Sequence, residues 1–384
     1  MTEPLIRADI DLGAIAHNTR EFSRIVPPHV KIMPAVKADG YGHGAIRVSN
    51  TALANGASAL GVSRIEEGIL LRKAGISVPI LVFGYASPDA SLDIIDHELT
   101  VTVSQADVAR ALSDKACHYG KKIGAHLKVD SGMGRIGMLT GKGHPGCPGH
   151  GQTALDEALV MARLPGLNLE GIYTHLASSD SRDKKDARDQ LDIFTSFVGE
   201  LERLGIEFQL RHAANSAAAI GLPESHLDMI RPGISFYGLP PSAQTDCSGI
   251  DLRPAMELKA KIISLKHVSK GFRVSYGSTY IADRETVIAV VPVGYADGFS
   301  RRFSSNGEML VRGIRAPIVG RVCMDLTMID VGHLPDLSLE EEVVIFGRQA
   351  GASLFVDELA LRLGTINYEI VSNLNARVKR CYRA

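Results

Sequence analysis

The sequence lacks the features that mark several large classes of protein. Its longest strongly apolar run, near residues 287–293, is far shorter than the roughly 20 residues of a membrane-spanning helix. The amino terminus, Met-Thr-Glu-Pro-Leu-Ile-Arg, has no apolar stretch of the signal-peptide type. The formal net charge of -1 gives no electrostatic basis for binding nucleic acid or an anionic membrane. These absences predict a cytoplasmic protein.

Cysteine is scarce and scattered. The five cysteines form no C-x-x-C pair, and they are Cys117, Cys147, Cys247, Cys323 and Cys381. An odd number without paired spacing indicates neither a disulfide framework nor a thiolate zinc site. We therefore expect a reducing compartment and no metal.

The composition is that of an ordinary soluble globular protein, with 45% apolar and 22% charged residues. A chain of 384 residues is longer than one hydrophobic core usually organises, so two domains are expected.

The first part of the chain alternates between short apolar runs and helical patterns. A helical period from Leu12 to Val26, which Asp11 could cap, comes first, and helix-like segments such as 64–73 and 187–204 follow. Between them lie eight predicted strands, at about 31–36, 58–62, 79–83, 99–103, 123–129, 168–174, 207–212 and 227–231. Eight strands alternating with helices predict an α/β fold, a (β/α)8 TIM-like barrel whose site lies on the loops after the strands.

The rhythm changes near Leu252 to strand after strand, with one helix at about 356–363. The predicted strands are 255–265, 286–293, 308–311, 321–331 and 343–346. With residues 240–249 as the linker, the sequence predicts a barrel over 1–245 and a mainly β domain over 246–384. The first ~10 residues are candidates for pairing with the β domain.

One lysine, Lys37, stands at the end of the first predicted barrel strand, in V-K-A-D-G-Y-G-H-G at 36–44. Side chains at strand ends reach the ligand crevice while the sheet holds their backbone in place. A lone, firmly held lysine suits a Schiff base with a carbonyl substrate or with pyridoxal phosphate. On spacing alone, however, a surface lysine before a turn is the favoured interpretation.

Taken with eight later segments, this stretch resembles the alanine racemases, which are pyridoxal-phosphate enzymes built as a barrel plus a β domain. The other segments are L-K-V-D-S-G-M-G-R-I-G at 127, G-I-Y-T-H-L-A at 171, A-N-S-A-A-A at 214, R-P-G-I-S-F-Y-G at 231, V-S-Y-G-S-T-Y at 274, G-Y-A-D-G at 294, C-M-D-L at 323 and N-Y-E at 367. Each is weak alone, but nine in the expected order favour the family over chance.

The resemblance implies roles for the catalytic pair and the cofactor site. Lys37 would carry the cofactor and act as a base on one face of the substrate. Tyr276, contributed by the other subunit of a homodimer, would act on the opposite face, helped by His175 and Arg231. The implied cofactor-binding residues are Lys37, Tyr41, His175, Ser216, Arg231, Gly233, Ile234 and Tyr368. Ser216 is also compatible with a simple helix N-cap.

The resemblance also implies how the substrate is recognised. Arg135 matches an arginine that contacts the cofactor's phenolic oxygen and the substrate carboxylate. Lys128 matches a lysine that many members carry as a carbamate, which would position that arginine. Met324 and Asp325 would come from the partner subunit, and Tyr295 would line the entrance together with Tyr368.

One segment departs from the family pattern. Residues 141–151, G-K-G-H-P-G-C-P-G-H-G, are longer and richer in glycine than expected. His144, Cys147 and His150 are evenly spaced, but so much Gly and Pro favours a mobile solvated loop over a metal site.

The expected activity is the interconversion of L- and D-alanine, which would supply D-alanine for peptidoglycan. Two alternatives stay open at this stage. One is a racemase of serine or of broad specificity, since one methylene changes selectivity by only about 1–3 kcal/mol. The other is a non-catalytic barrel protein that binds pyridoxal phosphate.

Overall fold

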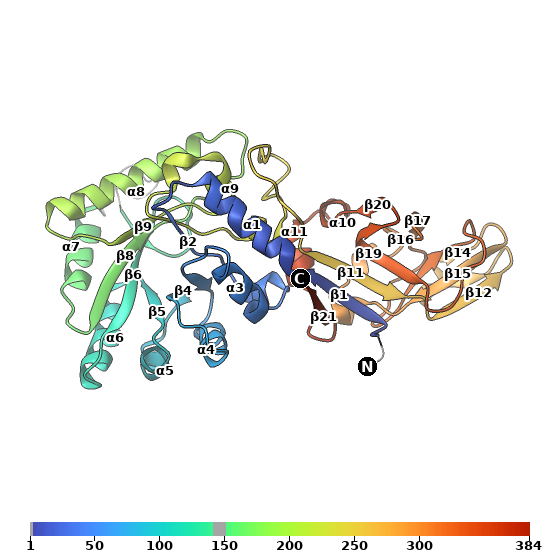
Figure 1. Ribbon diagram of the computed structural model, residues 1–384, viewed down its shortest axis with the longest axis horizontal. Coiled ribbons are helices and arrows are strands. Elements are labelled where there is room, and N and C mark those ends of the chain that lie inside the picture. Colours follow the sequence, from blue (N-terminus) through green and yellow to red (C-terminus); the bar gives the residue numbers. More distant parts are fainter. Residues whose placement is uncertain (1–2, 141–150) are drawn as a thin grey trace. The chain divides into compact units, whose positions relative to one another are not determined.

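The structure is a computed structural model that describes residues 3–140 and 151–384. The chain divides into two compact units (Figure 1). The barrel unit comprises the described residues of Ala14–Gly40 and Ala45–Pro254. The β unit comprises those of Met1–Gly13, Tyr41–Gly44 and Ala255–Ala384.

Parallel strands form the centre of the barrel unit, and each overlaps one of the eight predicted runs. They are β2 (Lys31–Ile32), β3 (Leu60–Val62), β4 (Ile80–Tyr85), β5 (Thr100–Val103), β6 (Ile123–Asp130), β8 (Leu167–Tyr173), β9 (Leu210–His212) and β10 (Met229–Ile230). The strands from β3 to β9 pair in that order, and β10 pairs with β2. Two contacts close the ring: a bridge between Ala35 and Gly61, and the Arg231 N–H donating to the Ala214 carbonyl at 2.9 Å. The predicted barrel is confirmed.

Helices lie outside these strands, as Figure 1 shows for α4, α5 and α6. The helices are α1 (Leu12–Ile25), α2 (Lys37–Tyr41), α3 (Ala45–Leu53), α4 (Ile65–Lys73), α5 (Ser91–Asp96), α6 (Ala106–His118), α7 (Gly151–Ala162), α8 (Lys185–Arg203) and α9 (Ser216–Gly221), with short 3₁₀ turns η1 (Pro88–Ala90), η2 (Pro223–Ser225) and η3 (Ile234–Tyr237). Helix α1 falls within the predicted helical period and ends two residues before Pro27, because proline cannot donate the next helical hydrogen bond. It buries Phe22 in a core cluster with Ile32 and Ile230.

The interior of the barrel is unusually polar near the carboxyl ends of its strands. His126, Lys128 and Asp130 alternate along β6, so they share one face, and all three are buried. Tyr173 of β8 and His212 of β9 are buried as well. Buried polar groups are costly unless they are hydrogen-bonded. Such a concentration therefore indicates a site rather than ordinary core packing.

The β unit contains three sheets. One follows the order β17-β16-β19-β11-β1-β21 with β20 beside β19, and the others are β12-β15-β18 and β13-β14. Their strands are β1 (Ile6–Asp11), β11 (Met256–Lys261), β12 (Ser264–Val268), β13 (Arg273–Val274), β14 (Tyr280–Ile281), β15 (Thr286–Val291), β16 (Glu308–Val311), β17 (Ile314–Pro317), β18 (Thr327–Asp330), β19 (Glu342–Gln349), β20 (Ala352–Leu354) and β21 (Lys379–Arg383). Strand β1 runs antiparallel to β11 and parallel to β21, which joins the two ends of the described chain in one sheet.

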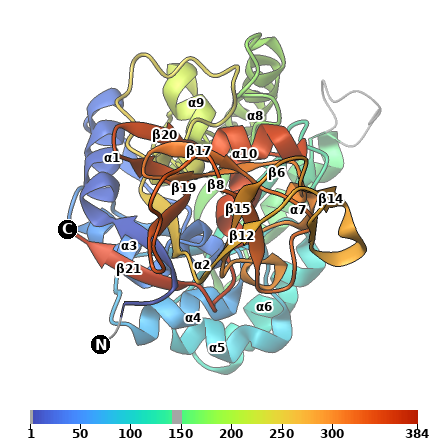
Figure 2. The same cartoon turned by 90° about the vertical axis from the view of Figure 1, so that its right-hand side faces the viewer.

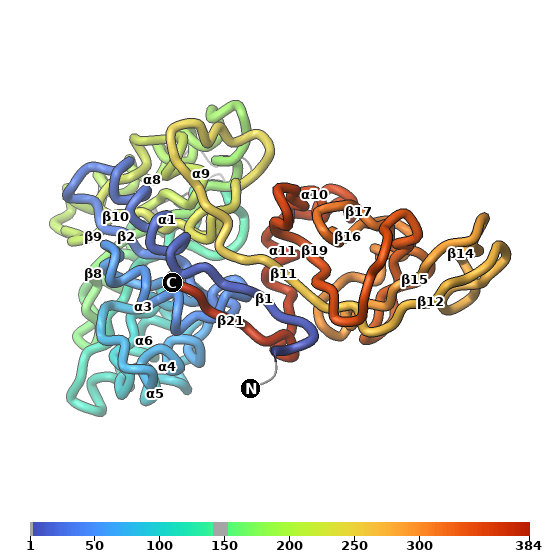
Figure 3. Tube along the Cα trace, turned by 45° about the vertical axis from the view of Figure 1, so that its right-hand side comes forward, coloured from blue at the N-terminus to red at the C-terminus, as the bar shows by residue number. Residues whose placement is uncertain are grey.

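Helices in this unit are few and short. They are α10 (Val356–Leu363) and α11 (Asn367–Ser372), with 3₁₀ turns η4 (Tyr276–Ser278), η5 (Tyr295–Asp297) and η6 (Arg301–Phe303). Figure 2 shows α10 beside β19 and β20, and Figure 3 shows β12 next to β15. The predicted helix at 356–363 is confirmed.

Two predicted strands of the β unit are wrong in extent. The run 255–265 is split between two sheets. The Ile262 N–H donates to the carbonyl of Glu341, directly before β19, whereas the Ile263 N–H donates to the carbonyl of Val290 in β15. Of the run 321–331, only Thr327–Asp330 forms a strand. The preceding residues turn, since the Cys323 N–H donates to the Leu326 carbonyl at 2.9 Å.

No helix among the described residues is long and apolar enough to span a bilayer.

Candidate active site

Lys37 follows the first barrel strand and opens a strained turn. The three residues after it have left-handed backbone angles, with φ of 52° at Ala38, 51° at Asp39 and 62° at Gly40, and Tyr41 continues at 51°. For residues other than glycine this conformation costs roughly 1–2 kcal/mol each. The left-handed conformation of the non-glycine residues was not predicted from the sequence. Strain of this kind persists where the surroundings hold it, and it is typical of functional sites.

Glu67 is the residue that holds the turn, and the sequence analysis missed it. One of its carboxylate oxygens accepts the Ala38 N–H at 2.7 Å. The other accepts the N–H groups of Ser63 at 2.7 Å and Arg64 at 3.1 Å, at the start of α4. An acidic residue in the first turn of a predicted helix was the available signal. Glu66 matched that signal equally well, so the sequence alone could not choose between them.

The surroundings of Lys37 favour its neutral amine. Burial lowers the pKa of Lys37, the charge of Arg135 lowers it further, and Glu67 partly opposes the shift. A neutral lysine amine is a nucleophile and a base, whereas the ammonium ion is neither.

Arg135 lies on a loop that Asp130 organises. One Asp130 oxygen accepts the N–H groups of Gly132, Met133 and Gly134 at 2.8–3.1 Å, and the other accepts that of Arg135 at 2.9 Å. Burial alone would raise the pKa of Asp130, but these four donors lower it overall. The ionised carboxylate therefore fixes the backbone from which Arg135 extends.

Lys128 is buried within the barrel with its Nζ 4.0 Å from the centre of the Tyr173 ring. Burial holds its pKa well below the ordinary value, Arg231 and Arg135 add to this, and Asp130 opposes it. The predicted carbamate lysine thus lies in a cationic environment that disfavours a second positive charge.

Arg231 is buried and hydrogen-bonded on one side. Its Nη2 donates to the carbonyls of Thr174 at 2.7 Å and Ala213 at 2.9 Å, and its Nη1 donates to His212 Nδ1 at 2.8 Å. The predicted partner, His175, lies at 3.5 Å, the outer limit of a hydrogen bond. The closer partner, His212, was missed, although it stands at the end of the predicted strand 207–212.

These contacts leave part of the guanidinium unused. Arg231 has no hydrogen bond from Nε, and only one from Nη1, to any residue in the described parts of the chain. Burial lowers the pKa of Arg231 to about 10, with Tyr173 opposing the shift, so the group stays charged at neutral pH.

Ser216, Gly233 and Ile234 lie together at the carboxyl ends of the last two strands. Ser216 Oγ accepts the N–H groups of Gly233 at 2.8 Å and Ser235 at 3.3 Å. Asn215, whose side chain accepts the Ala218 N–H, is the N-cap of α9, so the N-cap alternative for Ser216 is wrong. The hydroxyl of Ser235 is buried and has no partner within the described residues. This cluster of donors suits a bound anion.

The remaining predicted residues belong to the β unit. Tyr41 and Tyr368 contact each other, with ring centres 6.2 Å apart. Tyr276 on η4 is 71% exposed and Met324 is 53% exposed. Asp325 pairs with Arg377 at 2.7 Å.

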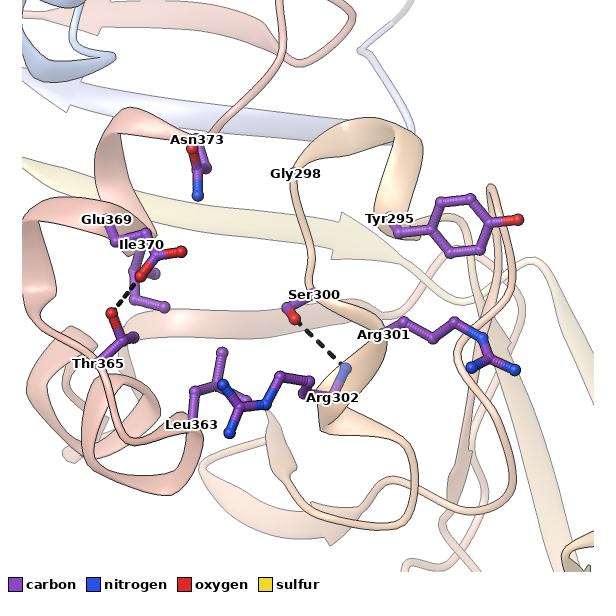
Figure 4. A pocket seen from close by; sticks show the side chains of 10 residues that line it. All are labelled: Tyr295, Gly298, Ser300, Arg301, Arg302, Leu363, Thr365, Glu369, Ile370 and Asn373. Atoms are coloured by element: carbon purple, nitrogen blue, oxygen red, sulfur yellow. Dashed lines mark hydrogen bonds between the residues drawn. The ribbon is translucent and has the colours of Figure 1, made fainter.

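Tyr295, the predicted entrance residue, lines a pocket of about 390 Å³ within the β unit. Figure 4 shows its ring at one edge, pointing away from Thr365 and Glu369 on the opposite wall. Arg301 extends from η6 below the Tyr295 ring, whereas Arg302 extends from η6 towards Leu363.

A metal site finds no support within residues 3–140 and 151–384, where no group of three or more His, Cys, Asp or Glu is arranged to hold an ion. His144, Cys147 and His150 lie outside the described residues.

The two family models of alanine racemase match the chain, the N-terminal domain over residues 10–241 and the C-terminal domain over 255–382. The curated alanine racemase of Desulfosudis oleivorans is 50% identical over 98% of this chain and 96% of its own length. A solved alanine racemase from Clostridium difficile 630 is 34% identical, with a TM-score of 0.93 over 100% of this chain and 97% of its own. The alanine racemase of Bartonella henselae, solved with covalently bound pyridoxal phosphate, is 24% identical with a TM-score of 0.86 over 99% of this chain and 100% of its own, which supports the fold alone. Family models that cover nearly the whole chain, and a relative sharing half of its residues, establish that this protein belongs to the alanine racemase family.

Proposed function

We propose that this protein interconverts L- and D-alanine with pyridoxal 5'-phosphate. The observation that carries the proposal is Lys37, a half-buried amine of lowered pKa at the end of a barrel strand, held by a strained turn. A lysine with a purely structural role would need neither the lowered pKa nor the strained turn.

The residues present fit the cofactor. The hydroxyl of Ser216, the backbone N–H of Ile234 and the unpartnered Ser235 hydroxyl would donate to a phosphate. The Gly233 N–H, which donates to Ser216 Oγ in this structure, would turn to the phosphate when it binds. Arg231 has unused N–H groups for an acceptor on the ring. Lys37, Tyr41, His175 and Tyr368 complete the proposed set. When bound, the cofactor supplies an aldehyde for the amine and a ring that withdraws electrons from the substrate's α-carbon.

Lys37 Nζ would take or return the α-proton on one face of the substrate. The partner subunit's Tyr276 would do so on the other face, which makes the enzyme a homodimer with shared sites. The high exposure of Tyr276 in one copy of the chain supports this assignment, because a catalytic phenol facing water would be poorly positioned. His175 and Arg231 would favour the phenolate of the partner's Tyr276.

Arg231 would limit how strongly the ring withdraws electrons. A guanidinium does not readily give up a proton, so an acceptor beside it stays unprotonated. A less stabilised carbanion returns its proton quickly, which suits racemisation better than side reactions.

Substrate binding would depend on Arg135 for the carboxylate, helped by the backbone N–H of the partner's Met324 and by the partner's Asp325. Carbamylation of Lys128 would supply an anion beside Arg135. Burial and the neighbouring positive charges lower the pKa of Lys128 and so favour its neutral amine, the form that reacts with carbon dioxide. Tyr295 and Tyr368 would restrict the entrance to small amino acids.

The test is exchange of the α-proton of each alanine enantiomer for deuterium in heavy water. The unaltered enzyme should exchange both. Lys37→Ala and Tyr276→Phe should each impair abstraction from one enantiomer more than from the other, because each residue serves one face. Binding of the cofactor without exchange would instead indicate a carrier, and turnover of L-lysine above that of L-alanine would exclude the proposed substrate.

The product D-alanine would serve peptidoglycan synthesis in the cytoplasm. The described cysteines, Cys117, Cys247, Cys323 and Cys381, are all free, which fits a reducing compartment.

A further inference from the structure

A line of three buried side chains crosses the barrel interior behind the proposed cofactor site. Arg231 Nη1 lies 2.8 Å from His212 Nδ1, and His212 Nε2 lies 2.8 Å from His126 Nδ1. They come from the segment after β10, from β9 and from β6. His126 belongs to no part of the proposed mechanism, and the resemblance assigned it no role.

The chemistry of arginine fixes the direction of every hydrogen bond in this line. A guanidinium can only donate, so His212 Nδ1 must be the unprotonated acceptor. A neutral His212 then carries its proton on Nε2 and donates it to His126 Nδ1. His126 in turn carries its proton on Nε2. Both rings are neutral at physiological pH, because burial and the charge of Arg231 lower the pKa of His126 to about 3 and that of His212 well below its usual range.

We propose that His126 is a positioning residue, which holds His212 in the Nε2–H tautomer so that Arg231 Nη1 is anchored and the free edge of its guanidinium stays aimed at one place. Without an acceptor at His126 Nδ1, the His212 Nε2–H would be buried without a partner. Flipping the His212 ring or changing its tautomer would then remove this unpaired N–H. Either change would present a protonated nitrogen to Arg231, which needs an acceptor there. The tautomer of His212 can be tested without reference to the proposed function. The effect of that tautomer on the reaction rests on the proposed function.

The packing around His126 supports a dedicated place for this ring. Gly171 of β8 lies directly against it, and a Cβ at Gly171 would come within 2.8 Å of both Cε1 and Nδ1 of His126. The Tyr173 ring stacks on His212, with an angle of 5° between the planes and 4.7 Å between the centres. One neighbour therefore makes room for the acceptor, and another fixes the plane of the donor.

The experiment is heteronuclear NMR of the holoenzyme labelled with ¹⁵N in the histidine rings, together with kcat and KM in both directions. In the unaltered protein His212 should show the Nε2–H tautomer. His126→Leu removes the acceptor and should convert His212 to a mixed or Nδ1–H population, with a fall in kcat of about 10-fold, as is common when a supporting group is removed. His126→Asn, whose Oδ1 can replace Nδ1, should restore both.

Two further variants separate positioning from packing. Gly171→Ala keeps His126 but pushes its ring away, and it should reproduce the change in the His212 spectrum. Thr102→Val removes the neighbouring 2.7 Å contact to the Tyr173 hydroxyl and should leave the His212 tautomer unchanged. An Nδ1–H tautomer in the unaltered protein would overturn the proposal, as would an unchanged His212 spectrum in His126→Leu. Since the first observation needs no variant, the proposal stays testable if His126→Leu fails to fold.

Discussion

At the scale of single residues, the site depends on groups that hold functional side chains rather than on those side chains alone. Lys37 is useful because Glu67 accepts the N–H of the next residue and so restrains a left-handed turn. Arg135 is placed because Asp130 accepts four backbone donors. In both cases a side-chain carboxyl group orders the backbone beside a basic side chain.

Glu67 and its neighbour Glu66 offer a matched test of this view. Glu67→Gln should lower the free energy of unfolding by about 2–4 kcal/mol, because the amide nitrogen would face backbone donors that now meet a carboxylate. It should also lower kcat, since the turn carrying Lys37 would loosen. Urea denaturation and steady-state kinetics measure the two effects.

The exposed Glu66, one position earlier on α4, is the control, and Glu66→Gln should change the free energy of unfolding by less than about 0.5 kcal/mol. Equal effects of the two substitutions would contradict a specific role for Glu67.

The sequence indicates the proposed site residues more readily than the residues that support them. Lys37, Arg135, Arg231 and Ser216 stand in short motifs that can be recognised in one dimension. Glu67 follows Lys37 by 30 positions, and His126 precedes His212 by 86. Their relevance arises only when the barrel brings separate strands together, and no local pattern encodes that contact.

At the scale of elements, strand β6 and the short strand β7 (Met138–Leu139) form the frame of the Arg135 loop. They pair in parallel, with Val129 opposite Met138 and Asp130 opposite Leu139. The chain returns closely enough that a Cβ at Gly137 would meet the Asp130 nitrogen at 2.4 Å and the Val129 carbonyl carbon at 2.6 Å. Gly134, three residues earlier, has nothing within 4 Å of such a Cβ.

These two glycines predict different costs for the same substitution. Both have positive φ, 67° at Gly134 and 141° at Gly137, so alanine is strained at either. Gly134→Ala should cost about 1 kcal/mol of stability, the conformational term alone. Gly137→Ala should cost about 3 kcal/mol or more and raise KM for alanine, because the backbone of β6 must move and Arg135 with it. Thermal denaturation and substrate titration of both variants would test this, and similar costs would argue against close packing of β7 on β6.

Whether a strand could be predicted from the sequence depended on the type of sheet to which it belongs. Barrel strands are buried on both faces, as all four residues of β5, Thr-Val-Thr-Val, are, so they read as short runs of β-branched and apolar residues and were found. The missed strands are short or lie at sheet edges. Strands β13 and β14 have two residues each, and β21 has the polar sequence K-R-C-Y-R, so none of the three shows a hydrophobic period. Pairing of β21 with β1 joins residues more than 370 positions apart, and sequence patterns do not report such partners.

At the scale of the whole molecule, the proposed division of the acid/base pair between subunits makes activity a property of the assembly. Neither the barrel unit with Lys37 nor the β unit with Tyr276 would be sufficient by itself in one copy. Homodimers commonly have two-fold symmetry, so each dimer would contain two equivalent sites, each taking one residue from either chain.

Subunit mixing tests this division directly. Lys37→Ala and Tyr276→Phe subunits are co-expressed with different tags, and the heterodimer is purified through both. One of its sites lacks both groups, whereas the other has both intact, so about half of the wild-type kcat per dimer should return although each homodimer is nearly inactive. The reciprocal control pairs a wild-type subunit with one that carries both substitutions. Every site of that heterodimer lacks one group, so it should stay nearly inactive. If the two residues instead served the same chain, the results would exchange: the first heterodimer would be inactive and the second half-active, and the shared site would have to be abandoned.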